Sequence, residues 1–227
     1  MEGINMSNNR HKMVANKNKR SYAHYIAKLW FRGTKKMSKQ AKTLTAQELR
    51  MVLDYIATRN HAARNRAMLL TTYYAGLRVG ETASLRYEDV VGADGKIKRE
   101  VLLKPEQTKG RHARTVFVND KLSKELENYI KAVPMRNSKD KLFYTQKRKE
   151  DGFTANTLTQ FFHYLYKRAG FCYASSHSGR RTFITNLAAK GVGVRVLMSL
   201  AGHRNISTTQ AYIDVNDNMK RKAVELI

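Results

Sequence analysis

The sequence contains a single cysteine, Cys172, among 227 residues. One thiol excludes an internal disulfide framework and a cysteine-rich zinc site, so we expect a protein of a reducing compartment. No apolar run approaches the length needed to cross a bilayer, and no secretory signal pattern opens the chain. These absences predict a cytoplasmic protein without a membrane partner.

Acidic residues are also scarce. Asp and Glu total 18 against 43 Lys and Arg, which gives a formal net charge of +25. This excess is larger than solubility requires and indicates a polyanionic partner, with nucleic acid the first candidate and an anionic membrane the second. Hydrophobic residues make up 42% of the chain, so the composition is typical of a folded protein.

Several short motifs of enzyme chemistry are missing. The sequence has no G-x-x-x-x-G-K-[ST] phosphate loop and no G-x-S-x-G nucleophile elbow. It has no H-x-x-x-H or C-x-x-C pair, and its carboxylates are not clustered in an acidic motif. We therefore expect no metal site.

The first part of the chain is strongly basic. Residues 1–43 hold eleven Lys or Arg and one acid, Glu2. We interpret residues 1–42 as a partly flexible basic arm, with a short helix in "YAHYIAKLWF". The arm is either a solubilising tail or a DNA-binding segment. Residues 43–227 are predicted to form one folded domain.

The periodicity after residue 43 predicts an α+β domain that is mostly α-helical with a small antiparallel β-sheet. Two β-prone runs, "REVLL" and "TVFV", flank a turn rich in Pro, Lys and Gly, which favours a hairpin or a three-stranded sheet. Helices are predicted within the ranges 43–56, 62–76, 79–90, 121–133, 154–170, 177–191 and 218–227.

Helix ends can be predicted from individual residues. Thr45 and Glu48 have the spacing of a capping box, and Gly76 is a plausible C-terminal stop. Ser207 and Gln210 have the same capping-box spacing. That spacing predicts that Tyr212 lies about one turn inside a helix.

Five cationic or imidazole side chains stand out in short motifs. They are Arg78 in "GLRVGE", Lys109 in "TKGRHAR", His177 and Arg180 in "HSGRR", and His203 in "AGH". A transferring phosphoryl group needs such donors, because charge spreads over its non-bridging oxygens in the transition state. Two guanidinium groups match phosphate geometry bidentately and could act without a metal.

These motifs, followed by "AGHRNISTTQAY", resemble in order the catalytic domain of the tyrosine recombinase (phage integrase) family. The resemblance covers about residues 43–220 and implies that family's catalytic-domain fold. The short N-terminal part is similar to minimal members that consist of a catalytic domain alone, such as fimbrial phase-variation invertases. In larger members a core-binding domain precedes the catalytic domain; here the arm or a partner protein would replace it.

The resemblance implies a nucleophile and a phosphate clamp. Tyr212 matches the nucleophile, which would attack a scissile DNA phosphate, form a 3′-phosphotyrosyl bond and release a 5′-hydroxyl. Arg78 and Arg180 match the two clamping arginines. No cofactor is expected, because the covalent bond conserves the energy of the phosphodiester.

The resemblance also assigns supporting roles. Lys109, with Lys104 and Arg111 as nearby alternatives, matches the lysine that protonates the leaving 5′ oxygen. His177 would position or deprotonate the nucleophile, and His203 would donate to the phosphate. Glu81 would orient the cluster. Four further cations are interpreted as DNA-backbone contacts or solvated charges: Arg111, Arg114, Arg181 and Arg204.

One residue departs from the family pattern. Gly179 stands where the family usually carries leucine, so we expect looser packing behind Arg180. The implied activity is site-specific recombination of duplex DNA by a homotetramer on two sites, through a Holliday junction. Two alternatives remain open: a type IB topoisomerase, which shares the chemistry, and a non-catalytic DNA-binding accessory factor.

Overall fold

Thr45 opens the first described helix through the predicted capping box. Its Oγ1 accepts a hydrogen bond from Glu48 N at 3.1 Å, and Glu48 Oε2 accepts one from Thr45 N at 2.9 Å. Two orphan amides at the helix N-terminus are thereby satisfied. Leu49, Val52 and Ile56 are buried along one stripe, as their spacing predicts.

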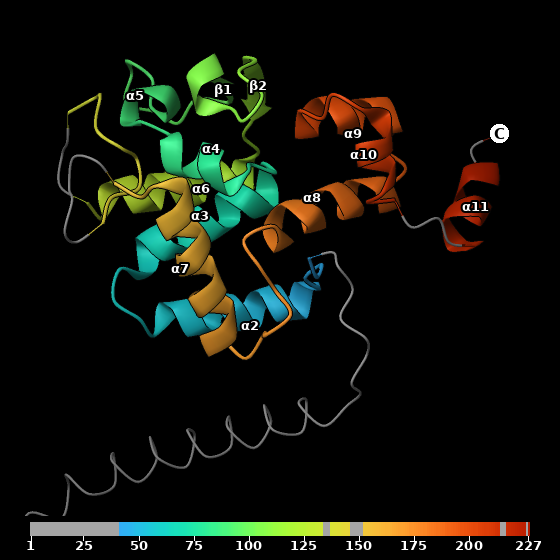
Figure 1. The fold of residues 1–227 in the computed structure, drawn as a ribbon, viewed down its shortest axis with the longest axis horizontal. Coiled ribbons are helices and arrows are strands. Elements are labelled where there is room, and N and C mark those ends of the chain that lie inside the picture. Colours follow the sequence, from blue (N-terminus) through green and yellow to red (C-terminus); the bar gives the residue numbers. More distant parts are fainter. Residues whose placement is uncertain (1–40, 134–136, 146–151, 214–216, 226) are drawn as a thin grey trace, which may run out of the picture. The chain divides into compact units, whose positions relative to one another are not determined.

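The computed structural model describes residues 41–133, 137–145, 152–213, 217–225 and 227, which belong to one compact unit (Figure 1). The predicted arm, including "YAHYIAKLWF", lies outside these residues except for its last two positions. The elements are α2 Ala46–Ala57, α3 Ala62–Tyr74, α4 Val79–Ser84, α5 Tyr87–Val90, β1 Glu100–Leu103, a 3-10 turn Pro105–Gln107, β2 Arg114–Phe117, α6 Asp120–Lys131, α7 Ala155–Arg168, α8 Ser178–Ala189, α9 Val194–Ala201, α10 Ile206–Gln210 and α11 Asp217–Val224.

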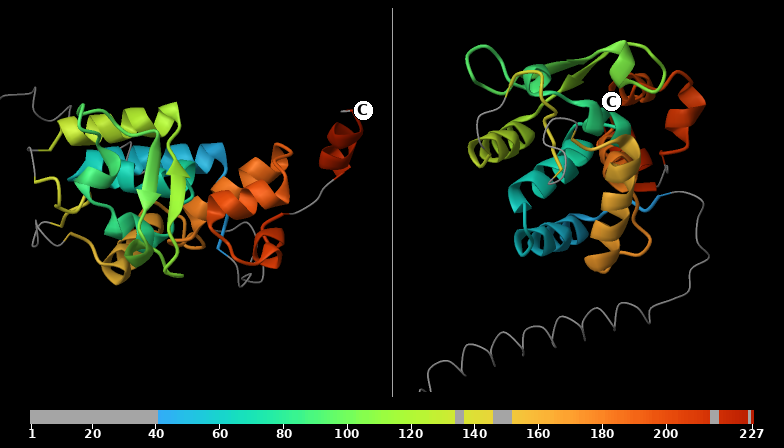
Figure 2. Two further views of the ribbon diagram at one scale, coloured as in Figure 1. Left: turned by 90° about the horizontal axis from the view of Figure 1, so that it is seen from above. Right: turned by 60° about the vertical axis from the view of Figure 1, so that its left-hand side comes forward.

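The two strands form the predicted hairpin. β1 and β2 pair antiparallel, with Val101 opposite Val116, and both valines are buried. β2 lies beside α9, so the sheet carries its connecting loop towards the C-terminal part of the domain (Figure 2). Within the described residues the sheet has two strands. The prediction of a mostly helical α+β domain is confirmed.

Helix α3 occupies the centre of the domain and packs against α2, α4, α6 and α8. Its residues Met68, Leu69 and Leu70 are at most 1% exposed. A helix surrounded in this way must be apolar on more than one face, unlike the striped α2. Because α3 contacts α8, it supports the helix that carries Arg180.

The contact between α3 and α8 contradicts the expectation of loose packing at Gly179. A Cβ placed on Gly179 would lie 2.2 Å from Thr72 Oγ1. This is closer than any side chain can approach, so the absence of a side chain is what lets α8 sit against α3. The packing behind Arg180 is tight.

The prediction for the segment before Tyr212 was wrong in detail. Helix α10 starts after Asn205, whose Oδ1 accepts bonds from the Ser207 backbone N and hydroxyl at 3.0 and 2.9 Å. Asn205 is as good a cap as Ser207 and comes two residues earlier, so it takes the capping position. The helix ends at Gln210, and Tyr212 lies in the turn that follows.

The other helix predictions agree in place but differ in extent. The range 79–90 contains two short helices, α4 and α5, because the backbone extends at Leu85 and Arg86. Thr154 caps α7 as expected, and Gly76 has a φ of +63° just after α3. Within the described residues, no helix is long and apolar enough to cross a membrane.

Candidate active site

A cleft of about 560 Å³ lies where three distant segments meet. Its lining includes Arg78 at the start of α4, Lys109 in the loop between β1 and β2, and His203 in the turn between α9 and α10. All three were predicted from sequence as catalytic residues. The fold therefore gathers groups that are up to 125 residues apart (78 against 203) around one concave surface.

Two arginines that line the cleft, Arg78 and Arg114, share a buried carboxylate. Glu81 is 1% exposed, and its Oε1 accepts from Arg78 Nη1 at 2.8 Å while its Oε2 accepts from Arg78 backbone N at 2.8 Å. Arg114 Nη2 donates to the same Oε2 at 2.7 Å. Arg78 Nη2 donates to Gly202 O at 2.9 Å. Glu81 thus orients Arg78 towards the turn that carries His203.

Two guanidinium groups keep Glu81 ionised. Burial by itself would raise the pKa of Glu81, but the hydrogen bond and charge of Arg114, together with those of Arg78, outweigh it and lower that pKa. A buried charge is tolerated in a fold when it is paired and hydrogen-bonded. Glu81 is therefore a fixed anion between two cations.

Arg114 differs from the exposed DNA contact that the sequence suggested. Its side chain is 11% exposed, and besides Glu81 it donates from Nη1 to Leu200 O at 2.9 Å. Alternation along β2 explains the difference, because Arg114 lies on the same face as the buried Val116. A Cβ on Gly202 would lie 2.6 Å from Arg114 Cδ, so the glycine makes room for this side chain.

Arg180 is the most buried of the predicted catalytic groups, at 3% exposed. It donates from Nη1 to Gly76 O at 2.6 Å and from Nη2 to Ala201 O, and its Nη2 lies 2.9 Å from His203 Nε2. Burial first, and then repulsion from Arg78, lowers the pKa of Arg180 to about 9. The guanidinium still carries its charge at pH 7, in a place that favours an anion beside it.

The protonation of His203 follows from its neighbours. Guanidinium nitrogens donate and do not accept, so His203 Nε2 must accept from Arg180. The ring proton is then on Nδ1, which lies 2.9 Å from Thr209 Oγ1. Burial, followed by the charges of Arg180 and Arg78, lowers the pKa of His203 to about 4. His203 is neutral at pH 7 in the DNA-free protein.

His177 immediately precedes α8, three residues before Arg180. Partial burial lowers its pKa, and the charges of Arg180, Arg78 and Lys109 lower it further. A histidine beside three cations stays neutral near pH 7 and can accept a proton. His177 and His203 were both predicted as catalytic residues, and the charges of Arg180 and Arg78 act on both.

Tyr212 lies beside His203 although it is outside helix α10. Its ring stacks on the imidazole of His203, with centroids 5.6 Å apart and planes 28° apart. The guanidinium of Arg181 lies 5.1 Å from the centroid of the Tyr212 ring, and Thr185 Oγ1 donates to Tyr212 O at 3.3 Å. Arg181, suggested as a DNA contact, thus faces the predicted nucleophile.

The rim of the cleft is cationic and open. Lys109, Arg111 and Arg204 are exposed. Arg204 Nη2 donates to Gly110 O at 3.0 Å, which links the hairpin loop to the turn after α9. Arg111 has a φ of +51°, in the left-handed region that non-glycine residues rarely adopt. The rim offers cations where a DNA backbone could approach.

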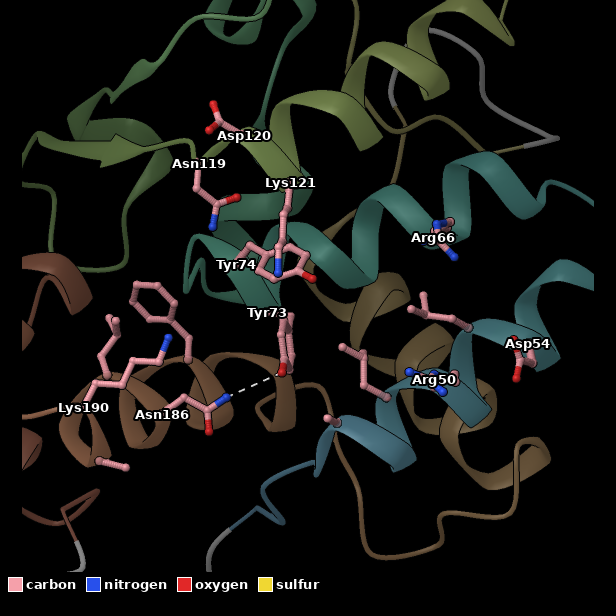
Figure 3. Close-up of a pocket in the computed structure, with 16 residues that line it drawn as sticks. Arg50, Asp54, Arg66, Tyr73, Tyr74, Asn119, Asp120, Lys121, Asn186 and Lys190 are labelled. Atoms are coloured by element: carbon pink, nitrogen blue, oxygen red, sulfur yellow. Dashed lines mark hydrogen bonds between the residues drawn. The ribbon is translucent and has the colours of Figure 1, made fainter. Parts of the chain in front are cut away.

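A larger hollow lies elsewhere on the described surface. It has a volume of about 1100 Å³ and is lined mainly by residues of α2, α3, α6 and α8, among them Arg50, Asp54, Tyr73 and Asn186 (Figure 3). None of the six predicted catalytic residues lines it. Size alone does not identify the site here. Among the residues that the structure describes, no group of three or more His, Cys, Asp or Glu could hold a metal ion.

Known proteins with similar sequences include tyrosine recombinases. A "Tyrosine recombinase" of Pseudothermotoga lettingae is 33% identical over 165 residues, which cover 71% of this chain and 53% of that protein. "Tyrosine recombinase XerA" of Thermococcus kodakarensis is 32% identical over 187 residues, covering 81% of this chain and 62% of that one. The chain thus spans about half to two thirds of the length of these relatives.

Solved structures show the same fold. A crystal structure of XerA recombinase matches with a TM-score of 0.65 at 24% identity, covering 83% of this chain and 66% of that one. The Tn1549 transposon integrase in complex with transposon right end DNA matches with a TM-score of 0.63 at 20% identity, covering 84% and 67%. Residues 42–219 match the phage integrase family. The chain belongs to this family, that of the tyrosine recombinases.

Proposed function

We propose that the protein is a site-specific recombinase that cleaves and rejoins duplex DNA through a 3′-phosphotyrosyl intermediate. The observation that carries the proposal is that Arg78, Lys109 and His203 line one cleft, while Arg180 lies within hydrogen-bond distance of His203 and Tyr212 stacks on it. Any one of these residues is a weak signal. Their convergence from separate elements is what a phosphoryl-transfer site requires.

The chemistry can be written for these groups. The Tyr212 oxygen attacks the scissile phosphorus as its proton passes to His177, and the bond to the 5′ oxygen breaks. Lys109 gives a proton to that leaving oxygen. Arg78 and Arg180 stabilise the negative charge that develops on the non-bridging oxygens. The reverse sequence, with a different 5′-hydroxyl as the attacking group, joins exchanged strands.

Arg180 is suited to this role although it is buried. Three of its five N–H groups contact Gly76 O, Ala201 O and His203 Nε2. The other two have no acceptor among the described residues and could serve a phosphate oxygen. A preorganised guanidinium needs little rearrangement when charge develops, which is how fixed donors lower a barrier.

The assembly on DNA is part of the proposal. Four copies would hold two sites and exchange one pair of strands at a time through a Holliday junction. The basic arm over residues 1–42, or a partner protein, would complete the grip on the duplex in the cytoplasm. The Tn1549 transposon integrase, which has a similar fold, was solved in complex with transposon right end DNA, and this supports DNA as the ligand. The exposed cations Lys109, Arg111 and Arg204 are consistent with a phosphate backbone at the rim.

A type IB topoisomerase would use the same chemistry without pairing two sites. Recombination between two sites on one plasmid distinguishes it from relaxation at a single site. A non-catalytic accessory factor is disfavoured, because the chain keeps every predicted catalytic residue and the cleft brings several of them together.

The test is covalent trapping on a suicide substrate that carries a nick next to the cleavage position. The wild-type protein should form a protein–DNA adduct in the presence of EDTA. Tyr212→Phe should form none while binding the same duplex with similar affinity, because only a hydroxyl is lost. An adduct that survives this substitution would contradict the assignment of the nucleophile.

A further inference from the structure

Thr209 is a fully buried polar residue that the proposed chemistry does not use. It is 0% exposed, and its Oγ1 lies 2.9 Å from His203 Nδ1. It sits in α10, six residues after the histidine and three before Tyr212. A buried hydroxyl needs a hydrogen-bond partner, and this one has the ring nitrogen that faces away from Arg180.

The direction of this hydrogen bond is fixed from the other side of the ring. Arg180 Nη2 lies 2.9 Å from His203 Nε2 and can only donate. A neutral imidazole has one N–H, so that N–H is on Nδ1 and donates to Thr209 Oγ1. The hydroxyl thereby accepts the Nδ1–H of the tautomer whose Nε2 lone pair points at the clamping arginine, and so stabilises that tautomer.

The same residue also holds the turn that carries the nucleophile. Thr209 O accepts from Tyr212 N at 2.9 Å. The side chain of Thr209 therefore contacts His203 while its backbone contacts Tyr212, and the two rings stack on each other. One residue sets the placement of the histidine bonded to Arg180 relative to the proposed nucleophile.

We propose that Thr209 is a positioning residue for DNA cleavage, which holds His203 in the Nδ1–H tautomer so that Nε2 accepts the hydrogen bond from Arg180. This proposal rests on the proposed recombinase function. Without the hydroxyl, the proton can move to Nε2, where its N–H would oppose the N–H of Arg180. The His203 ring and the Arg180 guanidinium would then separate, and Arg180 would no longer be held in one position.

The experiment compares Thr209→Val, which has nearly the same shape without the oxygen, with Thr209→Ser, which keeps the hydroxyl. Imidazole ¹H–¹⁵N correlation spectra of the full chain at pH 7 report the tautomer, with the His203 signals identified by their absence in His203→Asn. We expect the Nδ1–H tautomer in the wild type and in Thr209→Ser, and a shift towards Nε2–H in Thr209→Val.

The rate of adduct formation on the suicide substrate gives the second measurement. Thr209→Val should slow it by about tenfold, the effect of one unmade buried hydrogen bond, and Thr209→Ser should restore it. The matched control is Thr71→Val, which removes another buried hydroxyl, one bonded to Ala67 O in α3. This control should change neither the His203 spectrum nor the adduct rate at a temperature where it is folded.

An Nε2–H tautomer in the wild type would overturn the proposal. So would a Thr209→Val protein with an unchanged spectrum and an unchanged adduct rate. If the wild type forms no adduct, the proposed function fails. The spectra then still decide the positioning of His203, because they need neither DNA nor turnover.

Discussion

The inner and outer parts of the candidate active site are built differently. In the inner part, Glu81, Arg180 and Thr209 are at most 3% exposed. Glu81 accepts a hydrogen bond from Arg78, and both Arg180 and Thr209 lie within hydrogen-bond distance of His203. In the outer part, Lys109 and Arg204 are exposed on loops. The contacts of the inner part are made within the protein alone, whereas the exposed cations of the outer part would, under the proposed function, gain phosphate partners when DNA binds. Substitutions in the two parts should therefore have different combinations of effects on rate and stability.

The largest effect is expected where catalysis and burial coincide. Arg180→Ala should reduce the rate of adduct formation by about 10² to 10³-fold, because a fixed donor to the transition state is lost. Arg78→Ala should act in the same direction. Duplex affinity, measured in parallel by gel shift, should change little for both. Normal cleavage by both variants would point to other phosphate ligands.

Glu81→Gln tests whether the inner part is held together by charge. It removes the anion between Arg78 and Arg114 and leaves two cations close together. Loss of one partner of a buried ion pair costs about 3 kcal/mol in the free energy of unfolding. Urea denaturation measures the change, and Glu106→Gln on the exposed 3-10 turn is the matched control, expected to shift stability by less than about 0.5 kcal/mol. Equal stability of both variants would show that the pair is not structural.

Lys109→Ala tests the outer part. Loss of a general acid should slow cleavage by about 10²-fold, while the free energy of unfolding should stay within about 0.5 kcal/mol of wild type. A substrate with a sulfur leaving group at the cleaved 5′ position needs no proton and should restore the rate. Failure of that rescue, with Lys104→Ala or Arg111→Ala rescued instead, would reassign the acid.

The smallest expected effect is on how the free energy of unfolding depends on pH. Burial and nearby cations lower the pKa of His203 from 6.5 to about 4, so between these values the unfolded chain binds a proton that the folded chain does not. The contribution of His203 to the free energy of unfolding is therefore fully present above pH 6.5 and is lost as the pH falls towards 4. Urea midpoints at pH 7 and pH 5 should differ more for the wild type than for His203→Gln. Equal differences would contradict the lowered pKa.

Much of this architecture could be predicted from the sequence, because its signals are local. The capping box at Thr45 and the alternation in β1 and β2 depend on neighbours a few residues away. The order of the short motifs was enough to name the family and to nominate Arg78, Arg180, His203 and Tyr212, which the structure brings together. Their chemical roles remain predictions.

Predictions from the sequence were wrong or incomplete where contacts between distant residues determine the structure. Arg114 was considered an exposed cation, although its place on the face of Val116 indicated burial. Thr209 was missed because its partner, His203, is reached only through the turn between α9 and α10. The cap of α10 depended on a competition between Asn205 and Ser207 that propensity alone does not settle.

The close contact between Gly179 and Thr72 has a consequence for protein engineering. A designer who follows the family resemblance described for this position would introduce leucine at Gly179. Here even alanine would collide with Thr72 Oγ1, and the strain would fall on α8 next to Arg180. A larger residue at position 179 should therefore be combined with a smaller residue at position 72.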